Sequence, residues 1–258
     1  DVHVVYNDAR LDAPDAAAYD VHTYQDTDVT TSHHLTTSGL RDVLYDDVDF
    51  LHFVGHVTEH GLVCSDGVLD VRTLARTGVK AFFLNGCRSY EQGRALLTAG
   101  AVGGIVTVDD VADATAGGVG SDAAVLLDAG YALYAVLDVL SRTGVPADRY
   151  TVLGDGTFSV RRTVTSGPIL YDFDTDAYAP GADPIPFTVR CYPYDENSMG
   201  AVVSHSFSDA ASHVQSASPR HATITREELS DYLADPGIPT LVDGDLYLTD
   251  DLSVDDFP

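Results

Sequence analysis

The sequence has almost no lysine, no tryptophan and no long apolar run. Lys80 is its one lysine, against 40 Asp and Glu residues, and the formal net charge is −26 with a pI near 4.3. Binding to nucleic acid depends on clusters of Lys and Arg that displace counterions, so we expect no nucleic-acid partner. A membrane-spanning helix needs about 18 or more consecutive apolar residues. No such run occurs, so we expect no membrane span.

The acidic residues are mostly Asp and are spread along the whole chain. This pattern favours adaptation to a salt-rich cytoplasm, as in halophilic archaea, because concentrated salt screens the repulsion between carboxylates within a few Å. An acidic face that binds a basic partner is the alternative, and the sequence leaves it open.

Cysteine is also scarce, with Cys64, Cys87 and Cys191 widely spaced and no C-x-x-C pair. An odd count at such spacing argues against a disulfide framework or a structural zinc site, and favours a reducing, cytoplasmic location. No signal peptide is recognisable. Because residue 1 is Asp and the one methionine is Met199, we expect a processed or shortened product, and the sequence leaves open whether a segment lies upstream.

Apolar runs that read as strands alternate with segments that read as helices. We expect strands at Val2–Tyr6, near Val21–Tyr24, and at Phe50–Gly55, Ala81–Leu84, Gly104–Val108, Tyr150–Leu153 and Phe158–Val164. The expected helices are Ser38–Tyr45 capped by Thr37, Val71–Thr77, Glu91–Ala99, and a long Ala123–Ser141 capped by Asp122. This alternation predicts a mainly parallel sheet with helices on both faces.

The amino-acid composition and the hydrophobic pattern change near residue 166. Beyond it Pro and Gly become frequent and apolar alternation is short, while Thr225–Leu233, with Thr225 and Glu228 as a capping box, is the one helical segment. We therefore expect an α/β domain over 1–165 and a small β-rich appendage over 166–258.

Two residues with catalytic potential follow buried strands. His56 follows Phe50–Gly55, and Cys87 follows Ala81–Leu84 and an Asn85-Gly86 turn. Parallel strands end at one edge of the sheet, where ligands bind, so neighbouring strands would bring both side chains together. An imidazole can hold a thiol as the nucleophilic thiolate. Against this, a lone Cys is usually a buried apolar residue and a lone His a structural polar residue.

A longer stretch, Leu51–Ser89, resembles the CHAT-type peptidases of the caspase, separase and gingipain superfamily. The matching residues are Gly55-His56, Gly61-Leu62, Ser65-Asp66-Gly67 and Leu84-Asn85-Gly86-Cys87, and the likeness continues through Leu96–Asp110 and Leu153-Gly154-Asp155. About 150 residues are covered. The resemblance implies a caspase-like three-layer sandwich and a cysteine endopeptidase without a cofactor. It also implies that His56 is the general base and Cys87 the nucleophile. In such families a fused or upstream regulatory or sensor domain often controls the activity, so we expect one here.

The sequence departs from the family pattern in two places, one of them near the backbone N–H groups that would bind the oxyanion of the reaction. Family members usually have Gly after the catalytic His, and this chain has Val57; the family's usual Trp after the fourth strand is absent. Backbone N–H groups near Val57 and Gly86 are the expected oxyanion support. A catalytically silent caspase-like scaffold therefore remains the alternative function.

A second motif overlaps the first, because His56-Val57-Thr58-Glu59-His60 matches the zinc-peptidase pattern H-x-x-E-H. That pattern binds zinc from a helix, where residues i and i+4 share a face. Here it follows a strand and precedes a hairpin, so we expect no metal.

Three acids follow the Gly104–Val108 strand, at the edge where the His and Cys are expected. Asp109, Asp110 and Asp113 are candidates to line the pocket for a basic P1 residue of a protein or peptide substrate. Asp is abundant throughout the chain, so its presence here is weak evidence by itself.

Overall fold

The computed structural model describes residues 1–7, 27–161, 167–194, 202–204, 212–214 and 219–258. The chain divides into two compact units, and each is described by itself. The first contains Asp1–Asp128, Ala132–Ser141 and Val145–Val160; the second contains Ala129–Tyr131, Arg142–Gly144 and Arg161–Pro258. The domain boundary expected at 165/166 stays a prediction, since residues 162–166 lie outside the described part.

A six-stranded sheet forms the centre of the first unit. Its order is β2 (Val29–His33), β1 (Val2–Tyr6), β3 (Val48–Val54), β7 (Val79–Asn85), β8 (Gly103–Thr107) and β9 (Tyr150–Gly154). All neighbouring pairs are parallel except β8 with β9, which is antiparallel. A smaller antiparallel sheet holds β4 (Val57–Thr58), β5 (Gly61–Cys64) and β6 (Gly67–Leu69).

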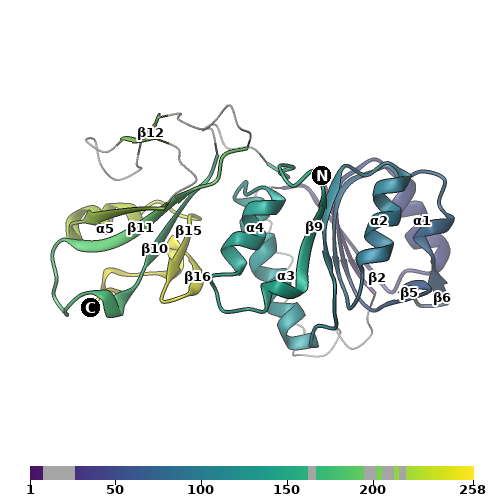
Figure 1. Ribbon diagram of the computed structural model, residues 1–258, viewed down its shortest axis with the longest axis horizontal. Helices are drawn as coiled ribbons and strands as arrows, with labels where there is room; N and C mark the ends of the chain where they lie inside the picture. The colour runs from purple at the N-terminus through teal and green to yellow at the C-terminus, as the bar shows by residue number, and fades with distance from the viewer. Residues whose placement is uncertain (8–26, 162–166, 195–201, 205–211, 215–218) are drawn as a thin grey trace. The chain divides into compact units, whose positions relative to one another are not determined.

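Helices cover both faces of this sheet, which makes three layers (Figure 1). Helices α1 (Thr37–Tyr45) and α2 (Tyr90–Ala99) lie on one face, and α3 (Asp113–Asp128) and α4 (Leu133–Leu140) lie on the other. The short 3₁₀ helices η4 (Val71–Thr73) and η5 (Ala147–Arg149) lie in connections. The expected mixed α/β class with a mainly parallel sheet is confirmed.

Alternate residues of each strand supply the two halves of the core. In β3 and β7 the side chains of Leu51, Phe53, Phe82 and Leu84 pack with α1 and α2, so Phe50, His52 and Phe83 belong to the opposite face. Because the sheet is buried on both faces, its strands are nearly continuous apolar runs.

The second unit has its own sheet and core. Its strand order is β14 (Arg220–Ile224), β11 (Ile185–Cys191), β10 (Ile169–Phe173), β15 (Pro239–Val242) and β16 (Asp245–Leu248). The remaining elements are β12 (Val202–Ser204), β13 (Ser212–Val214), α5 (Arg226–Leu233) and the 3₁₀ helices η6 (Thr175–Ala177), η8 (Thr249–Asp251) and η9 (Val254–Asp256). The expected capping box of Thr225 and Glu228 is present.

Several sequence-based boundaries are wrong. The N-cap of α1 is Thr36, not Thr37. The segment Val71–Thr77 makes only the 3₁₀ turn η4, because Thr77 and Gly78 bond instead to the carbonyl of Leu44. Residues 158–161 are not in a strand, and the remainder of that expected strand, like the one near Val21–Tyr24, lies outside the described residues.

The largest error concerns the long helix expected over Ala123–Ser141. Helix α3 begins at Asp113, so Asp122 lies inside it, and the chain breaks before α4 around Gly130, whose φ is 90°. Three glycines between residues 117 and 120 weaken the helical signal, but a hydrogen bond from Asn85 Nδ2 to the carbonyl of Ala116 (2.8 Å) ties this turn to β7.

Among the described residues, no helix has the length and apolar content that a membrane span needs.

Candidate active site at the carboxyl edge of the sheet

Strands β3 and β7 are direct neighbours and end in register. Val54 pairs with Asn85, and the Gly55 N–H donates to the Asn85 carbonyl (3.5 Å). His56 and Cys87 each lie two residues beyond this last pair. The His56 side chain is exposed and Cys87 is half-buried, so both predicted residues lie at the same sheet edge and are accessible there.

Gly86 is the point where the two turns touch. A Cβ atom at this position would lie 2.1 Å from the carbonyl oxygen of Gly55 and 2.9 Å from Cγ2 of Val57. Val57 turns its side chain into the core and is buried there. The β-branched side chain of Val57 is therefore accommodated because its neighbour, Gly86, has no side chain.

This contact predicts that Gly86→Ala destabilises the protein. The clash is with backbone rather than with a flexible side chain, so β3 and β7 would have to separate at their ends. We expect a loss of about 1–3 kcal/mol, as for overpacking in a core, measured by chemical denaturation. The matched control is Gly118→Ala in α3, where an added Cβ meets nothing within 4 Å. It should be neutral or stabilising by up to about 1 kcal/mol, and equal losses in both variants would contradict this account.

A buried hydroxyl pair fixes the turn that carries Cys87. The Ser89 Oγ donates to the Leu84 carbonyl (2.8 Å) and lies 3.1 Å from Thr107 Oγ1, which in turn donates to the Gly86 carbonyl. Backbone N–H groups of both residues donate to the partner's hydroxyl, at 3.0 and 2.9 Å. Ser89 and Thr107 thereby fix the backbone on both sides of Cys87. The sequence offered no sign of this pair beyond two ordinary hydroxyl residues.

One further polar residue at this edge, Tyr150, was missed by sequence reasoning. The Tyr150 hydroxyl donates to Asn85 Oδ1 (3.2 Å), and burial raises the pKa of Tyr150 well above its usual value, with a smaller contribution from nearby Cys87. Tyr150 begins β9. Because β9 is antiparallel to β8, its first residue lies at the edge where the parallel strands end.

The sulfur of Cys87 lies against the loop that follows β8. The Val111 N–H donates to Cys87 Sγ (3.3 Å), and Sγ is 3.4 Å from the Val111 carbonyl, to which the thiol can donate. Cys64 and Cys87 therefore differ in their surroundings and their accessibility. Burial raises the pKa of Cys64 to about 11, so Cys64 is a protonated thiol of the core, whereas Cys87 is partly accessible among polar groups.

The strand β3 carries a second histidine that could be mistaken for the base. His52 is 3% exposed and stacks on Phe83 with ring centroids 4.8 Å apart. Burial lowers its pKa to about 3, so it is neutral at physiological pH and inaccessible to a substrate. His56, two residues beyond the end of β3, is exposed to solvent instead.

The three candidate pocket acids follow the carboxyl end of β8, at the same edge of the sheet. Asp109 and Asp110 are exposed; Asp110 pairs with Arg88 (2.7 Å), and Asp109 Oδ1 accepts the Asp110 N–H (2.8 Å). Asp113 is the first residue of α3. The structure thus brings two of the acids together beside Cys87 and already gives Asp110 a cationic partner.

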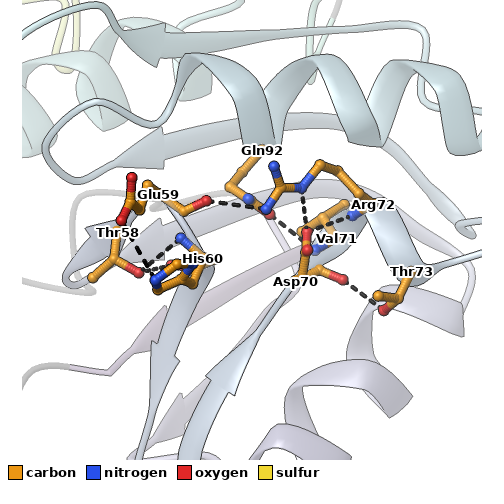
Figure 2. Close-up of polar contacts among 9 residues, drawn as sticks. Thr58, Glu59, His60, Asp70, Val71, Arg72, Thr73 and Gln92 are labelled. Atoms are coloured by element: carbon orange, nitrogen blue, oxygen red, sulfur yellow. Dashed lines mark hydrogen bonds and ion pairs between the residues drawn. The ribbon is translucent and has the colours of Figure 1, made fainter.

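The H-x-x-E-H sequence lies on a β-hairpin. Val57–Thr58 pairs with Gly61–Leu62, which leaves Glu59 and His60 at its tip. There Arg72 donates to the Glu59 carbonyl (3.0 Å) and pairs with Asp70 (2.7 Å), which ties the tip to η4 (Figure 2). Within the part of the chain that the structure describes, no three His, Cys, Asp or Glu side chains gather as metal ligands.

Comparisons with known proteins add a distant structural likeness. No protein-family model and no curated protein matches the sequence. Among solved structures, the Arg-specific cysteine proteinase gingipain R (RGPB) is 14% identical with a TM-score of 0.46, over 73% of this chain and 53% of that one. A complex of the pro- and mature domains of RgpB from Porphyromonas gingivalis is 13% identical with a TM-score of 0.45, over 73% and 54%. The matched region is thus about half the length of those chains.

Proposed function

We propose that this protein is a cysteine endopeptidase in which His56 is the general base and Cys87 the nucleophile. The observation that supports it most is the register of β3 and β7. The in-register pair Val54–Asn85 and the Gly86–Gly55 contact bring the two motif turns together at the sheet edge where parallel α/β sheets bind ligands.

The chemistry is acyl transfer. His56 takes the proton of Cys87, and the thiolate attacks the scissile carbonyl carbon, forming a C–S bond and an oxyanion. Backbone N–H groups near Val57 and Cys87 are the proposed donors to that oxyanion. As the intermediate collapses, the C–N bond breaks and the amine leaves with the proton from His56. Water, deprotonated by His56, then cleaves the thioester and restores the thiol.

We further propose that a regulatory partner or fused domain controls this activity, as the family resemblance implies. The competing proposal is a silent scaffold, which the valine after His56 favours. A reactive Cys87 separates the two, because a scaffold has no need of a nucleophile beside an accessible histidine.

The proposed substrate preference is a basic P1 residue. Asp109 and Asp110 lie on the loop that contacts Arg88, the residue after Cys87, whereas a preference for Asp would need convergent arginines, and Arg88 is already paired with Asp110. In peptides that differ only at P1, assayed at one salt concentration, we expect Arg and Lys to be cleaved faster than Asp.

Substitution should then identify the acid that recognises P1. A charged hydrogen bond contributes about 1.5–3 kcal/mol, so its loss should lower kcat/KM for Arg at P1 by about 10- to 100-fold. A basic P1 side chain would compete with Arg88 for Asp110, so Asp109→Asn should have the larger effect, with Asp113→Asn measured alongside. Faster cleavage after Asp or an apolar residue would refute this preference without refuting the peptidase.

A further inference from the structure

The loop Val108–Val111, here called the clamp loop, is attached to the Cys87 turn at several points. The Arg88 N–H donates to the Asp109 carbonyl (3.2 Å), and the Arg88 guanidinium pairs with the Asp110 carboxylate (2.7 Å). The Val111 N–H donates to the Cys87 sulfur (3.3 Å). Two consecutive residues of the nucleophile turn thus contact three consecutive residues of the loop.

The opposite side of the clamp loop is held by the segment before β9. The Val108 N–H donates to the Arg149 carbonyl (2.8 Å), and the Arg149 guanidinium donates to the Asp110 carbonyl. The clamp loop is therefore held between two arginines, Arg88 and Arg149, and its last residue, Val111, is buried.

The backbone beside Cys87 is also unusual. Arg88 has a φ of 51°, in the left-handed region that costs a non-glycine residue free energy. Such a conformation persists where surrounding contacts enforce it. Here Arg88 is held by its contacts with Asp109 and Asp110, together with the bonds that fix Ser89 next to it.

We propose that the Val111 peptide N–H stabilises the Cys87 thiolate, and that the Arg88–Asp110 pair is a positioning device that keeps the clamp loop within reach of the sulfur. As a thiol, Cys87 can donate to the Val111 carbonyl. After deprotonation the sulfur can only accept, and the Val111 N–H already lies at hydrogen-bond distance from it. The charged and titratable groups of the elements around the Cys87 turn and the clamp loop are His56 after β3, Arg88 after β7, Asp109 and Asp110 on the loop, Arg149 in η5 and Tyr150 at the start of β9.

The inference deepens the proposed function, since a peptidase needs the thiolate, but its test does not require turnover. The measurement is the pH profile of Cys87 alkylation by iodoacetamide, a small neutral probe of the thiolate, with peptide mass mapping to locate the label. Val111→Pro removes the N–H and keeps the carbonyl, whereas Val111→Ala keeps both. We expect Val111→Pro to move the half-maximal rate up by about one pH unit and to slow alkylation at pH 7 about tenfold.

A second, exposed substitution keeps the test decisive if Val111→Pro fails to fold by near-UV circular dichroism. Exposed ion pairs contribute little, so Asp110→Asn should slow alkylation at pH 7 about two- to threefold and shift the profile upward. Exchanging the charges, Arg88→Asp with Asp110→Arg, should restore most of the rate. Glu91→Gln is the matched control, because it removes the similarly exposed Arg94–Glu91 pair on α2 and should leave the profile unchanged.

The proposal would be overturned if folded Val111→Pro and Asp110→Asn were alkylated with the same pH profile as the wild-type protein. Faster alkylation in these variants would also overturn it, because the loop would then shield the sulfur. If the profiles shift as expected while no peptide is cleaved, the clamp stands and the peptidase assignment fails.

Discussion

Replacing Cys87 with alanine is expected to abolish peptide hydrolysis, with a loss of at least about 10⁴-fold in kcat. The reason is chemical, because without Sγ no thioester can form at this edge of the sheet. His56→Ala should cost a comparable factor, since the same reaction needs a base to take the thiol proton. Because the two residues act as a unit, the double variant should be barely worse than either single one. The measurement is steady-state hydrolysis of a fluorogenic peptide.

The other two cysteines are the controls for this experiment. Cys64 is a buried thiol whose pKa is raised, and Cys191 lies on β11 of the second unit. Cys64→Ala and Cys191→Ala should therefore retain turnover once their folding is verified. Activity that survives Cys87→Ala, or disappears equally in all three, would remove Cys87 from the mechanism.

Thermal stability is expected to rise steeply with salt. Fourteen basic residues cannot offset 40 acidic ones, so the folded chain concentrates a net charge of −26. At millimolar salt the repulsion reaches across the molecule, whereas at 1 M it is screened within about 3 Å. If screening contributes about 4 kcal/mol, the midpoint rises by about 8–16 °C between 0.05 and 2 M KCl. Differential scanning calorimetry would measure this change.

A charge variant distinguishes screening from a general salt effect on apolar burial. Asp231, Asp251 and Asp255 are exposed residues of the second unit. Their joint replacement by Asn should raise the midpoint at 0.05 M KCl and change little at 2 M KCl. A midpoint that is flat in salt would contradict self-repulsion and favour the alternative of an acidic face reserved for a basic partner.

The sheet and the ends of its central strands were predictable because they depend on local patterns. Buried parallel strands are continuous apolar runs, so Val2–Tyr6 was found at its full extent and the β3 and β7 runs in outline. The motif turns follow directly from those runs. Hence the placement of Gly55-His56 and Gly86-Cys87 at one sheet edge required only that β3 and β7 be neighbours, which they are.

What escaped prediction depends on contacts between distant segments. The start of α3 is set by Asn85 bonding Ala116, which outweighs the weak helical signal of its glycines. Tyr150 reaches the site because β9 runs antiparallel, a direction that its sequence does not reveal. Val111 contacts the Cys87 sulfur through its backbone and not through its side chain, so the residue type at position 111 gives no sign of it. Val57 looked unfavourable for an oxyanion hole because the sequence does not show that its side chain packs against Gly86, 29 residues further along the chain.

The most direct test of the account is covalent labelling of the folded protein with a peptide that carries an electrophilic carbonyl at its P1 Arg. The account predicts one adduct per chain, located on Cys87 by peptide mass mapping, strongly slowed in His56→Ala and prevented by prior iodoacetamide. Labelling of Cys87 that is no faster than labelling by an untargeted electrophile, or an adduct on Cys191 instead, would contradict a peptidase site built from His56 and Cys87.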